Sequence, residues 1–275
     1  MYKDYYHLKE EPFNITPDPR FLYLTAQHRE AINHLIYGIC QRRGFICLTG
    51  EIGAGKTTIC RALLNQLDPK FHTALILNPV LTETQLLRAI VQEFGIETKR
   101  LDRLGYLTIL NDYLLRTNAA GEDAVLIIDE AQDMPDPTLE MTRLLSNLET
   151  ESQKLLQIVL VGQPELRVKL SKPSFRQLQQ RITVRFHLGN MTQQDTEAYI
   201  RHRLSVAGAP PDDSQSAVRF EGDAVQEIYQ YSGGTPRLVN AVGDKALLAG
   251  YVYQTGRIDR SLVRLAVREL KEASW

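Results

Sequence analysis

The segment from Gly50 to Thr57 reads Gly-Glu-Ile-Gly-Ala-Gly-Lys-Thr, and it restricts the fold more than any other part of the chain. A short apolar run, residues 45–49, comes before it, and an amphipathic stretch with apolar residues at helical spacing follows it. A strand, a glycine-rich turn and a helix in this order form a phosphate-binding loop, because the turn aims main-chain N–H groups at a phosphate beside the positive end of the helix. The chain is therefore predicted to bind a nucleoside triphosphate.

The loop residues have separate expected roles. The glycines allow the tight turn, the Lys56 side chain is expected to reach the β- and γ-phosphates, and the Thr57 hydroxyl is expected to ligate Mg²⁺. The residues predicted to contact the nucleotide are Gly50, Glu51, Ile52, Gly53, Ala54, Gly55, Lys56, Thr57 and Thr58.

A second apolar run, residues 124–128, ends in two acids, Asp129 and Glu130. By itself such a pair is often only the end of a strand that meets water. Beside a phosphate-binding loop, Asp129 is expected to hold Mg²⁺ through its water shell, and Glu130 is expected to polarise the water that attacks the γ-phosphate. The two segments together predict an ATPase that uses ATP and Mg²⁺.

The composition is that of an ordinary globular protein, with 43% hydrophobic residues, 24% charged residues and a formal net charge of −1. A charge so close to zero gives no general attraction to nucleic acid or to an anionic membrane, so contact with either would need a local patch. No apolar run approaches the roughly 18 residues of a membrane span, and the N-terminus has no signal pattern. We expect a cytoplasmic location and no transmembrane segment of its own.

The three cysteines, Cys40, Cys47 and Cys60, are odd in number and lack metal-ligand spacing. Each lies within an apolar stretch. They are therefore predicted to be small buried hydrophobic residues of a protein in a reducing compartment.

Apolar runs alternate with helical patterns up to about residue 190, which predicts an α/β P-loop domain with a five-stranded parallel sheet. The expected strands are 45–49, 73–78, 124–128, 156–161 and 182–187, and helices are expected at 82–94, 101–115 and 135–148.

After residue 190 the pattern is helical only. Thr192 and Asp195 have the spacing of a capping box at the start of the first of these helices. The predicted domains are thus an α/β nucleotide-binding domain, 1–190, with an N-terminal arm, 1–35, and a small helical lid domain, 191–275. The expected lid helices are 193–206, 222–232, 236–251 and 259–272, with a loop at 208–213.

An α/β nucleotide domain followed by a helical lid resembles the AAA+ ATPases, and two polar positions fit that resemblance. Gln163 follows the fourth strand, where these proteins place a polar sensor of the γ-phosphate, although most of them use asparagine. The alternative is that Gln163 only caps the turn that follows it. Arg237, after Gly233-Gly234-Thr235-Pro236, resembles the second sensor, which binds nucleotide from the lid, although such turn chemistry occurs at many helix starts.

Arg181 precedes the fifth strand, where related ATPases carry an arginine finger that enters the site of a neighbouring subunit. The resemblance therefore implies a homo-oligomer, either a ring or a filament. Arg176 and Arg185 are rival candidates, and a surface salt bridge is the alternative role for Arg181.

Other segments resemble the ExeA-like family, also called the general secretion pathway protein A (GspA) family. This resemblance implies ATP-driven assembly of a cell-envelope apparatus, such as a type II secretion, pilus or polysaccharide-export system. Because no membrane span is seen, a partner protein is expected to make any link to the inner membrane or to peptidoglycan. The segments that carry the resemblance are 5–8, 12–13, 17–23, 28–31, 144–150 and 161–166.

The proline-rich N-terminal segment cannot form a long helix, so we expect it to pack as an extended arm. Related ATPases bind the base near this region. Pro12, Phe13 and Phe21 are therefore either neighbours of the adenine or ordinary core residues.

An alternative function is that of a DNA-associated AAA+ ATPase of the transposition-regulator type, which shares this architecture. Arg260, Arg264 and Arg268 recur every fourth residue and would form one basic stripe on the last helix. The opposite face of that helix is apolar, so the stripe is better explained as the solvated side of an amphipathic helix. A third interpretation is a nucleotide switch with little hydrolysis, which Glu130 argues against.

Overall fold

The computed structural model describes residues 1–14, 18–151, 153–210 and 218–272 of the 275-residue chain. The chain folds into two compact units. The α/β unit comprises Ala26–Glu51 and Lys56–Leu188, and the helical unit comprises Met1–Thr25, Ile52–Gly55 and Gly189–Trp275.

The α/β unit is built on one five-stranded sheet with the strand order β2-β3-β4-β1-β5. Every neighbouring pair of strands is parallel, as predicted. The second strand begins two residues earlier than predicted because Phe71 is already paired with Asp123. The strands are β1 (Phe45–Gly50), β2 (Phe71–Ile76), β3 (Asp123–Ile128), β4 (Leu156–Gly162) and β5 (Ile182–Leu188).

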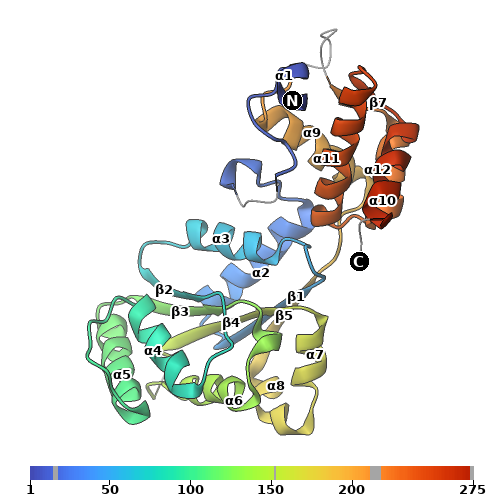
Figure 1. The fold of residues 1–275 in the computed structure, drawn as a ribbon. Helices are drawn as coiled ribbons and strands as arrows, with labels where there is room; N and C mark the ends of the chain where they lie inside the picture. The colour runs from blue at the N-terminus through green and yellow to red at the C-terminus, as the bar shows by residue number, and fades with distance from the viewer. Residues whose placement is uncertain (15–17, 152, 211–217, 273–275) are drawn as a thin grey trace. The chain divides into compact units, whose positions relative to one another are not determined.

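Helices cover both faces of this sheet (Figure 1). Helices α2 (Ala26–Cys40) and α3 (Lys56–Gln66) lie on one face. The helices on the other face are α4 (Glu83–Glu93), α5 (Arg103–Ala119), α6 (Asp136–Leu145), α7 (Pro164–Leu170) and α8 (Arg176–Arg181), with the 3-10 turns η2 (Ala131–Asp133) and η3 (Pro173–Phe175) between them. The sequence analysis predicted α3 to α6 but did not predict α2, α7 or α8.

Burial on both faces explains why the strands are almost continuously apolar. The side chains of a strand point alternately to the two faces. In β1, Phe45 and Cys47 belong to the large cluster that they form with α4, α5 and α6, whereas Ile46 and Leu48, also buried, are outside that cluster. The sheet is therefore held from both sides, and its carboxyl edge can present polar residues at fixed positions.

The four helices predicted for the second unit are present within one or two residues of the expected limits. The predicted capping box is also present, since Thr192 Oγ1 accepts a hydrogen bond from Asp195 N and Asp195 Oδ2 accepts one from Thr192 N. Residues 211–213 of the predicted loop lie outside the described residues. The elements are α1 (Tyr2–Tyr5), η1 (Pro19–Phe21), α9 (Gln193–Val206), β6 (Arg219–Phe220), α10 (Gly222–Ser232), α11 (Pro236–Val252), β7 (Arg257–Ile258) and α12 (Arg260–Glu272).

Residues 1–25 of the predicted arm pack within the helical unit, whereas the predicted domain limits placed them with residues 1–190. Residues 26–35, also predicted to be part of an extended arm, instead form the first part of α2 in the α/β unit. The buried Tyr6 hydroxyl lies 3.1 Å from the carbonyl oxygens of both Leu247 and Thr255. Phe13 and Phe21 belong to the core of this unit, and Phe13 packs edge-on against Phe220. Aromatic burial thus draws the arm to the helical unit, and these two phenylalanines serve as core residues. Pro17 lies outside the described residues.

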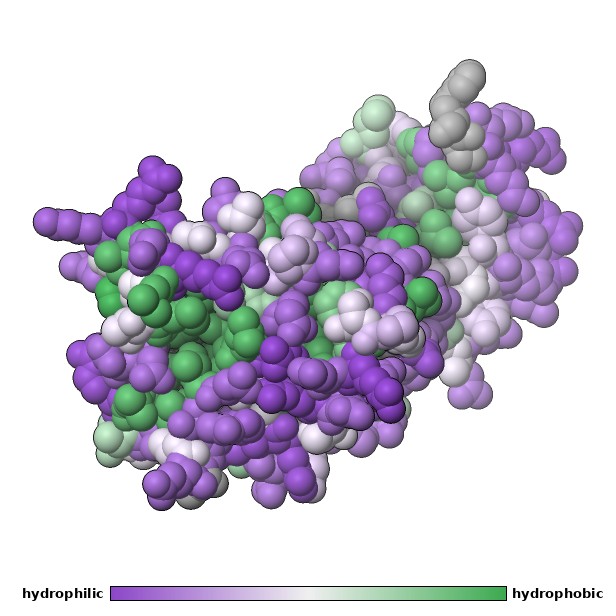
Figure 2. Space-filling view, turned by 90° about the horizontal axis from the view of Figure 1, so that it is seen from below, coloured by the Kyte–Doolittle hydropathy of each residue, from purple (hydrophilic) through white to green (hydrophobic). Residues whose placement is uncertain are grey.

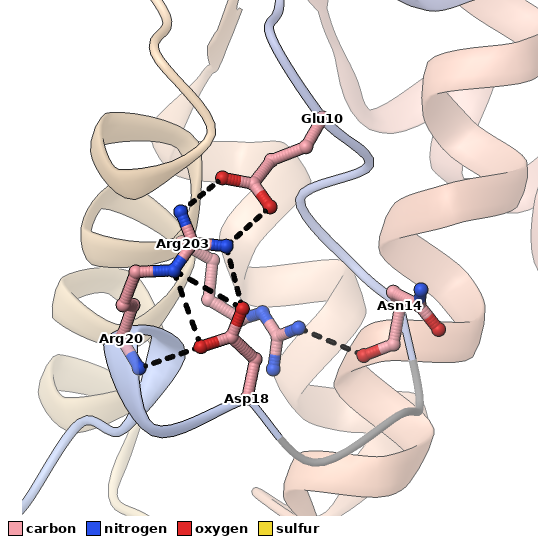
Figure 3. A network of polar contacts seen from close by, with 5 residues as sticks. All are labelled: Glu10, Asn14, Asp18, Arg20 and Arg203. Atoms are coloured by element: carbon pink, nitrogen blue, oxygen red, sulfur yellow. Dashed lines mark hydrogen bonds and ion pairs between the residues drawn. The ribbon is translucent and has the colours of Figure 1, made fainter.

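The side chain of Arg203, from α9, binds main-chain carbonyl groups of the N-terminal arm (Figure 3). Its guanidinium donates hydrogen bonds to the carbonyl oxygens of Pro12 and Asn14, the latter at 2.8 Å, and lies 4.7 Å from the centre of the Phe21 ring. Beside it, Arg20 forms ion pairs with Glu10 and Asp18 at the surface. The buried cation thus supplies hydrogen-bond donors to main-chain carbonyl groups of the irregular arm.

Two of the three cysteines are buried as predicted, but Cys40 is exposed. The prediction for Cys40 was wrong because this residue ends α2, where the chain turns to the solvent before β1. An apolar stretch of sequence does not bury every residue of an amphipathic helix.

The surface of the α/β unit is mixed. Figure 2 shows hydrophobic residues gathered on the side that holds α4 and α5, within largely hydrophilic surroundings. The exposed large hydrophobic side chains between β2 and the end of α5 are Leu77, Val80, Leu104 and Leu115. Among the helices of the described residues, none has the length and apolar character that crossing a bilayer requires.

Candidate functional site

The glycine-rich segment links β1 to α3, as the sequence predicted. Gly50 ends β1, where a Cβ atom would lie 2.7 Å from the Leu188 carbonyl oxygen on the neighbouring strand. Gly53 and Gly55 have φ angles of +78° and +98°, which side chains strongly disfavour. The three glycines therefore permit a turn between strand and helix that no other residue type could form without strain.

Lys56, the first residue of α3, is folded back on the start of the loop. Its Nζ donates hydrogen bonds to the carbonyl oxygens of Gly50, at 2.8 Å, and Glu51, at 2.9 Å. The residue is only 6% exposed, and this burial lowers the pKa of its ammonium group, while Glu130 and Asp129 act in the opposite direction. A buried cation held by neutral carbonyls is suited to bind an anion that comes close to it.

Thr57 and Asp129 meet at the carboxyl edge of the sheet. Thr57 Oγ1 donates a hydrogen bond to Asp129 Oδ2 at 2.6 Å, and Glu130 N donates one to Asp129 Oδ1 at 2.9 Å. Asp129 is 2% exposed, and burial raises the pKa of its carboxyl group above the ordinary value. The loop and the acidic strand end are therefore adjacent, as the two motifs required.

This pair of oxygen ligands fits Mg²⁺. Magnesium prefers hard oxygen donors, and it usually takes one or two carboxylates together with water and substrate phosphates. A closed protein metal site would need a cluster of three or more histidine, cysteine or acidic residues. The described residues contain no such cluster. Thr57 and Asp129 are therefore suited to a magnesium ion that arrives with a nucleotide.

Glu130 lies at the turn that follows β3, in a conformation that is unusual for its residue type. Its φ and ψ angles are 49° and 38°, in the left-handed region, which costs a residue with a side chain about 1–2 kcal/mol. Its Oε2 accepts hydrogen bonds from Gln132 Nε2 at 2.8 Å and from Gln163 Nε2 at 3.2 Å. The carboxylate is thus held by two side-chain amides beside the Thr57–Asp129 pair.

Gln163 lies directly after β4, which is the strand next to β3. It occupies the N-cap position of α7, yet its side chain makes no capping hydrogen bond. The side chain is instead directed to Glu130. The capping alternative is therefore not what the structure has, and a role for Gln163 as a phosphate sensor remains a prediction.

Gln132 belongs to the same hydrogen-bonded group, and the sequence analysis missed it. Its side chain contacts both Glu130 and the main chain of Gln163. A polar residue three positions after Asp129, next to the end of a neighbouring parallel strand, was the signal that could have indicated it.

Arg181 lies apart from this group, at the end of α8. Its Nη1 donates hydrogen bonds to Ser146 Oγ and Asn147 Oδ1, each at 2.6 Å. Its two rivals differ: Arg185 donates to the Gln179 carbonyl oxygen at 2.7 Å, and Arg176 is exposed at the start of α8. The partners of Arg181 are thus neutral, and within the described part of the chain it forms no ion pair, so the surface salt bridge is not observed. Its role as a finger remains a prediction.

Arg237 belongs to the helical unit, which also contains loop residues 52–55. It is the second residue of α11. A Cβ atom on Gly53 would lie 2.8 Å from Arg237 Cβ and 3.2 Å from Thr235 Cγ2. The second-sensor segment and the loop glycine are therefore neighbours within this unit.

Two of the three arginines of the basic stripe on α12 have acidic neighbours. Arg264 forms an ion pair with Glu227 of α10 at 3.1 Å, and Arg260 lies 3.6 Å from the same carboxylate and donates to Gln226 at 3.1 Å. Two of the three stripe arginines thus contact residues of α10 within the helical unit.

Known proteins resemble this chain in sequence and in structure. Residues 39–170 match the family described as an AAA domain. The whole chain aligns at 44% identity with general secretion pathway protein A of Aeromonas hydrophila, and it spans half the length of that relative.

Among solved structures, the ORC2 protein of Aeropyrum pernix gives a TM-score of 0.66 at 16% identity, over 95% of this chain and 72% of that one. Drosophila ORC bound to DNA gives 0.67 at 18% identity, over 94% and 64%, and the RuvB Holliday junction branch migration motor of Thermotoga maritima gives 0.57 at 19% identity, over 88% and 69%. At such low sequence identities these similarities support the fold alone. They confirm the predicted class, an α/β P-loop unit with a helical unit.

Proposed function

We propose that this chain, an AAA+ protein homologous to general secretion pathway protein A, binds ATP at the Gly50–Thr57 loop and hydrolyses it to ADP and phosphate. The observation that carries the proposal is the contact between Thr57 and Asp129, with the Glu130 carboxylate beside it. A hydroxyl, a buried carboxylate and a second carboxylate at the edge of a phosphate-binding loop are the groups that triphosphate hydrolysis needs.

Each residue has a distinct task in this proposal. Lys56 exchanges its bonds to loop carbonyls for bonds to the phosphates, and Thr57 and Asp129 hold Mg²⁺, which neutralises phosphate charge when it is bound. Glu130 orients the attacking water and accepts a proton from it as the new P–O bond forms. Gln163, from the adjacent strand, reports the state of the γ-phosphate to Glu130 through their shared hydrogen bond. Arg237 is proposed to contact the bound nucleotide.

Binding and hydrolysis are tested with two variants that separate them. Lys56→Ala should abolish binding of a fluorescent ATP analogue, because it removes the buried cation. Glu130→Gln should keep binding within about threefold and lose at least about 100-fold in turnover, since general-base assistance contributes about 10²–10⁴. Equal nucleotide affinity in Lys56→Ala and the unmodified chain would refute the site, and binding without hydrolysis in the unmodified chain would favour a nucleotide switch.

We further propose that the working unit is a homo-oligomer, a ring or a filament, in which Arg181 of one copy serves the site of the next. In support, Arg181 is held by two neutral side chains, Ser146 and Asn147, and it lies away from Glu130's own hydrogen-bond partners. The relative's name connects it with the general secretion pathway. The proposed role is therefore to drive assembly of a cell-envelope apparatus from the cytoplasmic side, with a partner protein providing any link to the inner membrane.

This role is tested by identifying the proteins that copurify with the Glu130→Gln variant in the presence of ATP. Components of a secretion, pilus or export apparatus would support it, and transposase or replication proteins would contradict it. The variant is suitable because a trapped ATP state should hold its client instead of releasing it.

A DNA-associated role is the second candidate. Arg257, Arg264 and Arg268 line one surface pocket of the helical unit together with Tyr253, an arrangement that could contact a phosphate backbone. Against it, Arg257 pairs with Glu221 and Arg264 pairs with Glu227. Absence of duplex DNA binding at about 20 mM salt would exclude this candidate, because phosphate contacts are strongest at low salt.

A further inference from the structure

A single side chain, Gln132 of η2, joins the proposed water-polarising carboxylate to the end of the adjacent strand. Gln132 Nε2 donates to Glu130 Oε2 at 2.8 Å and to Asp133 Oδ2 at 3.1 Å. Gln132 Oε1 accepts a hydrogen bond from the main-chain N–H of Gln163 at 3.0 Å. Both amide hydrogens and the amide oxygen of Gln132 are therefore engaged.

The orientation of this amide follows from its partners. A main-chain N–H can only donate, so the oxygen of Gln132 must face Gln163. The NH₂ group is then directed at the two carboxylates, which can only accept while they are ionised. A flipped amide would place its oxygen against Glu130 and two donors against each other, so the partners permit only one arrangement.

The surroundings of Gln132 fix it in place. Lys169 of α7, whose side chain is mostly buried, donates to the carbonyl oxygen of Gln132 at 3.1 Å and also to that of Met134, which ties η2 and the residue after it to α7. On the side of the sheet, a Cβ atom on Gly162 would lie 2.7 Å from Gln132 Oε1. Glycine at the end of β4 therefore leaves the space that the Gln132 amide occupies as it reaches Gln163.

We infer that Gln132 is a positioning residue for Glu130, which couples the carboxylate to the strand end that carries Gln163; this inference rests on the proposed ATPase function. Gln132 and Gln163 both bond to Oε2, whereas among the described residues none donates to Oε1 of Glu130. One carboxylate oxygen is thus fixed and the other is left for a water molecule. Because Gln132 also bonds to the main chain of Gln163, a shift of that strand end moves the carboxylate.

The test replaces Gln132 by methionine, which keeps the length of the side chain and removes its donors. We expect turnover to fall about 10- to 100-fold, because a misplaced catalytic group costs about 10²-fold. The affinity for ATP should stay within about twofold, because Gln132 contacts neither Lys56 nor Thr57 in the described structure. As a matched control, Asp133→Asn removes a charge from the outer partner of the same amide and should keep turnover within about twofold.

Gly162→Ala tests the same contact without altering Gln132. Its methyl group would lie 2.7 Å from Gln132 Oε1 and 2.9 Å from Leu166 Cδ2, so turnover should again fall, and Leu166→Ala in the same background relieves the second contact. If both changes act through one contact, the double variant should be no slower than the slower single variant, whereas independent damage would multiply. Multiplied losses would overturn the inference.

An unmodified chain that does not hydrolyse ATP would refute the function. An active unmodified chain with an equally active Gln132→Met variant would overturn the positioning role alone.

Discussion

Thr57 donates a hydrogen bond to Asp129 across 2.6 Å, although the two residues are 72 positions apart in the chain. Thr57 lies in the first turn of α3, after β1, and Asp129 follows β3. These strands are not neighbours, because β4 lies between them. The contact forms because the carboxyl ends of parallel strands meet at one edge of the sheet, and the loop after β1 reaches across that edge.

The first prediction concerns the stability of the nucleotide-free protein and its dependence on pH. Burial raises the pKa of Asp129 in the folded chain, so the folded state binds this proton more tightly than the unfolded state does. The free energy of unfolding therefore falls as pH rises from the ordinary aspartate pKa, about 3.9, through the raised value, and it stays lower above that value. Asp129→Asn removes this loss.

Asp129→Asn should accordingly raise the melting temperature at pH 7 by about 2–4 °C for each kcal/mol of unfolding free energy that is recovered. Near pH 3.5 it should have little effect. It should at the same time weaken the Mg²⁺-dependent part of ATP binding. Thermal melts without nucleotide between pH 3.5 and 8 measure the first effect. A melting-temperature difference that does not vary with pH would contradict the argument.

The second prediction concerns Arg181. Arg181→Ala subunits and Glu130→Gln subunits should each be nearly inactive, since an arginine finger is worth about 10³–10⁵ in turnover. Mixed together, they should recover part of the ATPase activity, because some interfaces then pair an intact Arg181 with an intact Glu130. The measurement is turnover against mixing ratio.

Arg176→Ala and Arg185→Ala are the matched controls for that experiment. Each removes one positive charge from the same region, from the first residue of α8 or from β5. Both should keep turnover within about threefold on the present proposal. If no activity is recovered at any mixing ratio, then Arg181 is not an arginine finger that acts between subunits.

The third prediction concerns the cysteines. Cys40 is exposed, whereas burial raises the pKa of Cys47 to about 11 and also raises that of Cys60. The thiolate is the reactive species, so an aromatic disulfide reagent at pH 8 should modify Cys40 rapidly in the folded protein and the other two only after unfolding. Cys40→Ser should remove the rapid phase. A rapid phase that persists in this variant would mean that a buried thiol becomes accessible.

The fourth prediction concerns Arg203, which fastens the N-terminal arm. Arg203→Met keeps most of the side-chain volume but leaves the carbonyl groups of Pro12 and Asn14 without this donor. We expect a loss of about 2–4 kcal/mol in the free energy of unfolding, since hydrogen bonds to charged groups contribute about 1.5–3 kcal/mol each. Urea unfolding measures the loss.

Arg201→Met is the control for Arg203→Met. Arg201 lies on the same helix and forms an exposed ion pair with Glu197 at 2.8 Å, and such pairs are worth about 0.2–1 kcal/mol. Equal losses in the two variants would show that the arm gains no stability from the buried arginine.

Several differences between the sequence predictions and the structure have one cause. Cys40 and Cys47 both lie in apolar stretches of sequence, but only the three-dimensional course of α2 exposes the first. The stripe of Arg260 and Arg264 is regular in sequence, yet Glu227 comes from another helix to pair with it. In each case the environment of the side chain is supplied by residues that are distant in the chain.

The sequence alone was enough to predict the phosphate-binding loop, the acids that end the third strand, the five parallel strands and the helices α3 to α6 and α9 to α12, because a contiguous motif and a local periodicity specify these features. Three features became known only from the three-dimensional structure: the contact of Thr57 with Asp129, the sharing of Glu130 by Gln132 and Gln163, and the packing of residues 1–25 in the helical unit. These contacts depend on strand order and on how side chains fill the remaining space, and neither is encoded in any one segment of the chain.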